Sequence, residues 1–300
     1  MRILIVGLPK SGTTILTYRV AAALDGAVVE FEPLGGPDAE LAAGAEHVVT
    51  KKLLGTQTHD LADFGHYDRR IWICRDPRDF LVSQTLYRWH RETEPDPSDQ
   101  QAFDRVVERL VAKEADPASV PFADLEPADY ANTYEAVARL WVRERGPGWH
   151  LYRYEDMVAG RYADLEAYLG FAVDHEATVA DGLERVVRAR SAGDWRHWFT
   201  EGDVDHYRRA GLDGYMATFG YDLDDWSLAP EPVIDPAHGS GYVTGLFNDH
   251  RLPGDGVDGA DENGADGAQS GGALDADGRA TPVAKRLLGR LRGAGLIRSA

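Results

Sequence analysis

The sequence predicts an α/β fold in which a mainly parallel β-sheet is flanked by helices. Two strongly apolar runs, residues 2–7 and 70–74, are each followed by a turn and then by a stretch of helical character. Continuous apolar runs of this length are typical of strands that are buried on both faces of a parallel sheet. Further short strands alternate with helices along the first 170 residues, which is the pattern of repeated βαβ units.

The expected elements follow one another without an internal repeat. The run RILIVG at 2–7 ends in a glycine, and a glycine-containing turn then leads into a helix over 14–24. After the second apolar run, Asp76-Pro77 marks the start of a helix over 78–90. The other expected elements are strands over 27–31, 46–50 and 149–153, and helices over 99–115, 131–146 and 161–169.

The amino-acid composition of the chain changes after Trp226. Residues 255–280 are rich in glycine and acidic residues and contain almost no large apolar side chain, so they cannot bury enough area to offset their ordering entropy. We therefore expect a main domain over 1–226, a Pro/Gly-rich extension over 227–254, a disordered acidic linker over 255–280, and a basic amphipathic helix over 281–300.

Charge and cysteine content exclude several classes of protein. The formal net charge of −18 argues against bulk nucleic-acid binding. Residues 1–91 are nevertheless neutral, with 11 basic and 11 acidic side chains, so a small charged ligand remains compatible. The single cysteine, Cys74, excludes an internal disulfide framework. The chain has no apolar run long enough to cross a membrane and no leader-like segment, so we expect a cytoplasmic protein.

The segment between Gly7 and Thr14, GLPKSGTT, has the composition of an anion-binding turn. Backbone N–H groups of such a turn and of the following helix N-terminus can cradle an anion. Lys10 adds a mobile positive charge, and Gly12 lets the main chain approach closely. The spacing nearly matches G-x-x-x-x-G-K-[ST], but Thr13 stands where that nucleoside-triphosphate motif requires lysine. A purely structural glycine turn is the alternative.

The run PKSGTT from Pro9 to Thr14 resembles the 5′-phosphosulfate loop of sulfotransferases, of prokaryotic type, that use 3′-phosphoadenosine-5′-phosphosulfate (PAPS). A second segment carries Arg75 and Ser83 at the spacing with which the family holds the donor's 3′-phosphate. A third carries Tyr154, in Tyr-Glu-Asp-Met, where the family places a tyrosine near the adenine.

A fourth segment, residues 188–200, is similar to the family's late loop that closes over the 3′-phosphate. Gly193 and the following Asp-Trp fall in register. Ala189 and Arg190 replace the family's Lys-Gly, so either Arg188 or Arg190 could contact the phosphate. Ile15 replaces the tryptophan that usually follows the two threonines.

The resemblance implies a sulfotransferase-like catalytic domain, with PAPS as donor and no metal requirement. It implies that Lys10 contacts the leaving oxygen of the donor. It also implies that Lys51 or its neighbour Lys52 is a second lysine that faces the sulfonate. The donor-binding residues that it implies are Pro9, Lys10, Ser11, Gly12, Thr13, Thr14, Arg75, Ser83, Tyr154, Arg188, Arg190 and Gly193.

The general base is less determined, because Leu53 occupies the position of the histidine found in animal cytosolic members. Glu32 is the candidate, with Glu30 and His59 as alternatives. The acceptor that we expect is a hydroxyl compound, and a glycan, a glycolipid and a small alcohol all remain open. The alternative functions are a P-loop small-molecule kinase and a non-catalytic nucleotide-binding protein. The basic segment 281–300 could contact an anionic membrane or dock on the acidic body of the chain.

Overall fold

The computed structural model describes residues 1–33, 36–38, 41, 43–55, 61–90, 95–125, 131–179, 183 and 187–249. The expected linker over 255–280, the basic helix over 281–300 and His59 lie outside these residues.

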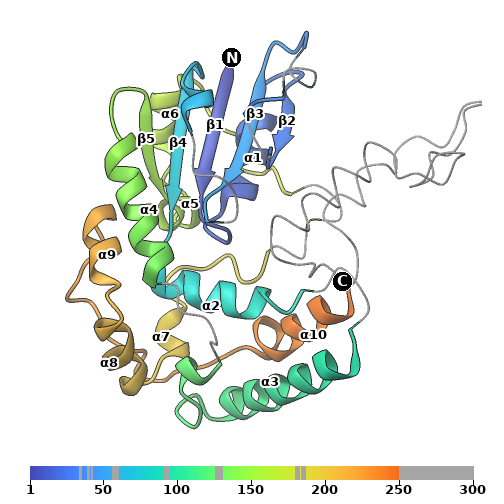
Figure 1. Ribbon diagram of the computed structural model, residues 1–300, viewed down its shortest axis with the longest axis vertical. Helices are drawn as coiled ribbons and strands as arrows, with labels where there is room; N and C mark the ends of the chain where they lie inside the picture. The colour runs from blue at the N-terminus through green and yellow to red at the C-terminus, as the bar shows by residue number, and fades with distance from the viewer. Residues whose placement is uncertain are drawn as a thin grey trace, which may run out of the picture.

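A five-stranded sheet in the order β2-β3-β1-β4-β5 forms the centre of the molecule, and every pairing in it is parallel (Figure 1). The first strand lies in the middle, with Val6 level with Lys52 on one side and Trp72 on the other. This arrangement confirms the fold class expected from the sequence. The strands are β1 (Arg2–Gly7), β2 (Val28–Phe31), β3 (Val48–Leu53), β4 (Arg69–Cys74) and β5 (Trp149–Arg153).

Helices cover the sheet and extend past its carboxyl end. The helices that the structure describes up to residue 169 are α1 (Thr13–Ala22), α2 (Pro77–Tyr87), α3 (Pro97–Ala115), α4 (Ala131–Glu144), α5 (Tyr154–Val158) and α6 (Ala163–Leu169). Four more in the described part of the chain, which like α5 the sequence did not indicate, are α7 (Trp195–Trp198), α8 (Glu201–Arg209), α9 (Asp213–Phe219) and α10 (Ser240–Asn248). Short 3-10 turns are η1 (Ala62–Phe64), η2 (Phe122–Asp124) and η4 (Pro236–His238).

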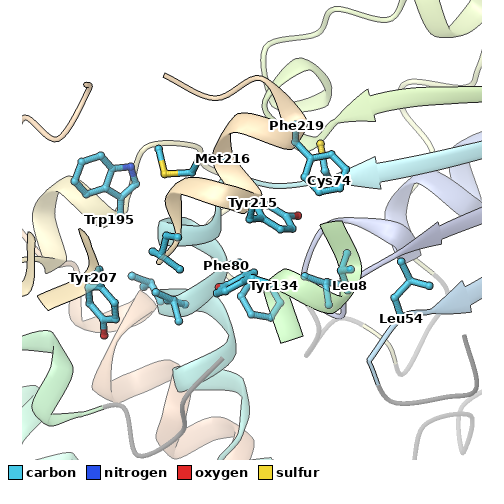
Figure 2. Packing of buried hydrophobic residues seen from close by; sticks show 14 of the residues in the cluster. Leu8, Leu54, Cys74, Phe80, Tyr134, Trp195, Tyr207, Tyr215, Met216 and Phe219 are labelled. Carbon is cyan, nitrogen blue, oxygen red and sulfur yellow. The ribbon is translucent and has the colours of Figure 1, made fainter. Parts of the chain in front are cut away.

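The side chains of β1 alternate between two hydrophobic clusters, as the pleat requires. Ile3 and Ile5 are fully buried in a cluster that includes residues of α1 and α6. Leu4 and Val6 are fully buried in a larger cluster on the other face, which takes in residues of α4 and α9. Figure 2 shows part of this larger cluster. Burial on both faces explains why β1 reads as a continuous apolar run.

Beyond the carboxyl ends of the strands lie α2, α3, α7 and α10 (Figure 1). Phe103 of α3 stacks on Phe247 of α10 with 3.8 Å between ring centroids, and Trp89 packs edge-on to Phe103. The α10 helix belongs to the segment 227–254 that the sequence analysis separated as an extension. The division of the chain at residue 226 remains a prediction.

Candidate functional site

The turn between β1 and α1 has the conformation of a tight, glycine-dependent loop. Ser11 donates from its backbone N and its Oγ to the carbonyl of Leu8, at 3.2 and 2.6 Å. Gly12 has a φ of +89°, and a Cβ there would lie 2.6 Å from Cδ2 of Tyr154. A side chain at this position would therefore be strained and would also collide with the tyrosine. Gly12 thus packs the turn against Tyr154, a role the sequence did not indicate.

The N-terminus of α1 is shaped to favour an anion. No side-chain cap to α1 occurs among the described residues, and its first turn carries no acidic residue. Its first residues are Thr13, which is buried, and Thr14, which is partly exposed. Backbone N–H groups at a helix start carry partial positive charge, and an anion stabilises them. The predicted turn, including the partly exposed Pro9 and Lys10, is therefore compatible with phosphate or sulfate.

Arg75, at the end of β4, connects three of the predicted segments. Its Nη1 donates to the carbonyl of Lys10 at 3.0 Å, and its Nη2 donates to the carbonyl of Ser191 at 3.4 Å. Its guanidinium carbon lies 4.3 Å from the ring centroid of Tyr154. The Nε atom is buried and has no hydrogen-bond partner among the described residues. Segments 65 and 116 residues away along the chain therefore converge on one side chain.

Asp79 of α2 attaches the late loop to that helix. Its fully buried carboxylate accepts hydrogen bonds from the backbone N of Gly193 at 2.6 Å and of Trp195 at 2.9 Å. Burial raises the pKa of Asp79, against the opposing charge of Arg75. The sequence did not indicate a role for Asp79. Its position in the first turn of a helix that begins with Pro77 explains how the carboxylate reaches the loop.

The two arginines between which the sequence could not choose differ in environment. The Arg188 side chain is only 4% exposed, pairs with Asp194, and donates from Nη1 to the carbonyl of His238 at 3.3 Å. Its Nε is buried without a hydrogen-bond partner among the described residues. Arg190 is exposed and has a φ of +50°. Ser83 is buried on α2, two turns beyond Arg75.

Glu155 follows Tyr154 and holds the turn between β4 and α2 at Asp76. Its Oε1 accepts from the backbone N of Asp76 at 2.8 Å, and its Oε2 accepts from the hydroxyl of Tyr221 at 3.0 Å. Burial raises the pKa of Glu155 to about 7. The sequence gave this residue no role. The available signal was its place directly after a tyrosine at the end of a strand.

Glu32 and Lys51, two of the predicted catalytic residues, are brought together at the ends of β2 and β3. The Nζ of Lys51 pairs with Oε1 of Glu32 and lies 3.9 Å from the ring centroid of Phe31. Burial lowers the pKa of Lys51, although the charge of Glu32 opposes this. Lys52 alternates to the opposite face of the sheet, where its Nζ donates to the carbonyl of Pro33 at 3.3 Å.

Glu30, an alternative for the general base, is buried in a local network. Its carboxylate accepts hydrogen bonds from the hydroxyl of Thr50 at 2.6 Å, from the hydroxyl of Tyr67 at 3.4 Å, and from the backbone N of Asp38. These contacts give Glu30 a structural role in joining β2 to β3 and to the loop that carries Tyr67.

The described part of the chain also lacks a metal-ligand cluster and a membrane-spanning helix. No group of three or more His, Cys, Asp or Glu side chains there could hold a metal ion. No helix within those same residues is long and apolar enough to cross a membrane.

Fold and site together define an α/β protein whose central strand is followed by a glycine-dependent turn and a helix N-terminus that are compatible with an anion. No family model matches the chain, and no curated protein matches it. Among solved structures, mouse sulfotransferase SULT7A1 complexed with PAP is 16% identical, with 73% of this chain and 88% of that chain covered and a TM-score of 0.48.

Retinol dehydratase is a second structure to which the chain is similar. In complex with androsterone and the inactive cofactor PAP it is 16% identical, covering 76% of this chain and 82% of that chain with a TM-score of 0.39. In complex with retinol and PAP it is 16% identical, covering 77% and 83%, with a TM-score of 0.38.

Proposed function

We propose that the chain is a PAPS-dependent sulfotransferase, which transfers a sulfuryl group to a hydroxyl acceptor and releases adenosine 3′,5′-bisphosphate (PAP). The observation that carries the proposal is the position of Arg75. Its guanidinium joins the turn at Lys10, the loop at Ser191 and the ring of Tyr154. Four segments selected for their resemblance to a donor site thus meet around one buried cation.

The residues present fit such a donor. Its anionic groups require compensating charge, and the buried Nε atoms of Arg75 and Arg188 have no partner among the described residues. A guanidinium with a spare N–H beside an open helix N-terminus suits a ligand with phosphates at two positions. In the proposal the turn from Pro9 to Thr14 and the start of α1 hold the 5′-phosphosulfate. The residues proposed to bind the 3′-phosphate are Arg75, Ser83, Gly193 and either Arg188 or Arg190.

The bound donor would supply an activated sulfate, and the protein's task is then to position the reactants and to neutralise charge. Lys10 projects from the turn and stabilises negative charge on the leaving oxygen. Tyr154 forms one wall of the nucleotide site, where burial against Arg75 fixes its ring. The scheme assigns no step to a metal ion.

Glu32 remains the proposed general base. Its carboxylate is paired with Lys51 at the carboxyl end of the sheet, and its side chain is 27% exposed. The pairing holds the carboxylate in place at the carboxyl end of the sheet, where a base could accept the proton of an acceptor hydroxyl. Glu32→Gln should therefore retain PAP affinity within about twofold and lose on the order of a hundredfold in kcat. Unchanged turnover by Glu32→Gln would remove Glu32 from the mechanism.

Calorimetry with PAP, with and without Mg²⁺, tests the proposed class. Metal-independent micromolar binding is expected, whereas a requirement for Mg²⁺ would support the kinase alternative. Transfer of label from [³⁵S]PAPS to an acceptor then separates an enzyme from a non-catalytic nucleotide-binding protein.

Lys10→Ala tests the role of the turn. It should reduce transfer by at least about a hundredfold, because it removes the charge placed at the leaving oxygen. Retained activity would contradict the assignment. Arg139→Ala, on the exposed surface of α4, is the control.

The acceptor class is proposed only as a hydroxyl compound: a glycan, a glycolipid or a small alcohol. An acceptor screen with labelled donor identifies it. The proposed peripheral membrane contact through 281–300 is tested by sedimentation with anionic liposomes, comparing the full chain with one ending at residue 280.

A further inference from the structure

The ammonium group of Lys10 lies on the face of an aromatic ring. Its Nζ is 3.7 Å from the ring centroid of Tyr87, at the end of α2. A lysine ammonium over the face of a tyrosine at this distance is attracted by the ring quadrupole. Tyr87 lies four residues after Ser83, so both residues occupy the same side of the helix. The contact therefore joins the anion-binding turn to the side of α2 that carries a proposed donor ligand.

The main chain of Lys10 is fixed independently of this contact. Its φ is +64°, in the left-handed region that residues with a Cβ rarely occupy. Arg75 Nη1 donates to its carbonyl oxygen at 3.0 Å. The lysine is thus held at both ends by different elements, its carbonyl by the end of β4 and its ammonium by α2. Between these points runs a long side chain with several rotatable bonds, and the contact with the ring favours one position of its ammonium group.

We propose that Tyr87 is a positioning residue for Lys10, whose aromatic face holds the ammonium beside the anion-binding turn before the donor reacts. This inference rests on the proposed sulfotransferase function. Removing the ring leaves the turn, the α1 N-terminus and the Arg75 contacts in place. The loss therefore falls on the step in which Lys10 stabilises developing charge, and less on donor affinity.

Two substitutions separate the aromatic face from the volume of the side chain. Tyr87→Leu removes the ring but keeps an apolar side chain at a partly exposed position. It should lower kcat about three- to tenfold, with PAP affinity by calorimetry within about twofold of wild type. Tyr87→Phe keeps the ring face and should retain kcat within about twofold. A Leu variant as active as wild type, or a Phe variant as impaired as the Leu variant, overturns the proposal.

A double-mutant cycle tests the contact without any assay of activity. Urea unfolding is measured for wild type, Lys10→Met, Tyr87→Leu and the double variant. A favourable coupling of about two- to tenfold in the unfolding equilibrium constant supports the contact, and additive effects overturn it. If wild type neither binds PAP nor transfers sulfate, the proposed function fails, while this cycle still decides whether Tyr87 holds Lys10.

Discussion

Among single residues, Glu155 shows most clearly how burial sets the properties of a side chain. Its pKa rises from 4.5 to about 7, chiefly because burial disfavours the carboxylate. The folded protein therefore holds the proton more tightly than the unfolded chain does. Below pH 4.5 the group is neutral in both states and its protonation stabilises the fold fully. As the pH rises through about 7, that contribution is lost.

Glu155→Gln should remove the pH dependence that Glu155 contributes to stability. The amide keeps an acceptor for the backbone N of Asp76 and carries no charge at any pH. Compared with wild type, the variant should gain on the order of 1–3 kcal/mol in free energy of unfolding between pH 5 and pH 8. Urea denaturation at four pH values measures the gain. Glu135→Gln, exposed on α4, should show no such trend. If the free energies of unfolding of wild type and Glu155→Gln changed with pH in parallel, this explanation of the role of Glu155 would be contradicted.

At the scale of elements, the attachment of the late loop to α2 depends on Asp79. Both carboxylate oxygens accept from backbone N–H groups of the loop. Asp79→Asn leaves one oxygen and places an NH₂ group against a backbone donor. The expected cost is about 1–3 kcal/mol of stability. The Gly193 and Trp195 amides should also lose hydrogen-exchange protection.

The exposed Asp205 of α8 supplies the control for this substitution. Asp205→Asn should leave both stability and the protection of the loop amides unchanged. If the Gly193 and Trp195 amides stayed protected in Asp79→Asn, the loop would be held by other contacts.

Which elements the sequence predicts depends on where their stability originates. The strands and, apart from α5, the helices up to residue 169 carry apolar runs or turn signals of their own, and the structure confirms them within a few residues. The α10 helix contains two glycines in a Pro/Gly-rich stretch. It is stabilised from outside, by burial of Phe247 and by hydrogen bonds from Ser240 to Glu114. Its buried side chains, Val243, Leu246 and Phe247, span little more than one turn, which is too short a run to indicate a helix without those tertiary contacts.

In the candidate site too, some features could be predicted from the sequence and others could not. Its segments could be recognised because each is a short run with residues at fixed spacing. The bonds that assemble them could not, because a side chain that accepts from a distant backbone N–H leaves no pattern. Asp79 and Gly193 are 114 residues apart. The Glu32–Lys51 pair follows from the register in which Phe31 is level with Lys51, and register between strands is a property of the folded sheet.

At the scale of the whole molecule, α10 attaches the end of the described chain to α3. Phe247 is 1% exposed and stacks on Phe103. Phe247→Ala should cost about 3–5 kcal/mol in free energy of unfolding, because it removes the stacked ring and leaves a cavity. Urea denaturation measures this loss. Val233→Ala, at a position 71% exposed, should change stability by less than about 0.5 kcal/mol. Equal effects of the two would show that α10 adds little to the fold.

The stack of Phe103 on Phe247 also has a consequence for synthesis on the ribosome. About 140 residues separate the two rings along the chain, and translation adds roughly 5–20 residues per second. The apolar side of α3 is therefore made roughly 7–30 s before the helix that covers it. During that interval a growing chain exposes Phe103 and its neighbours to other nascent chains and to chaperones.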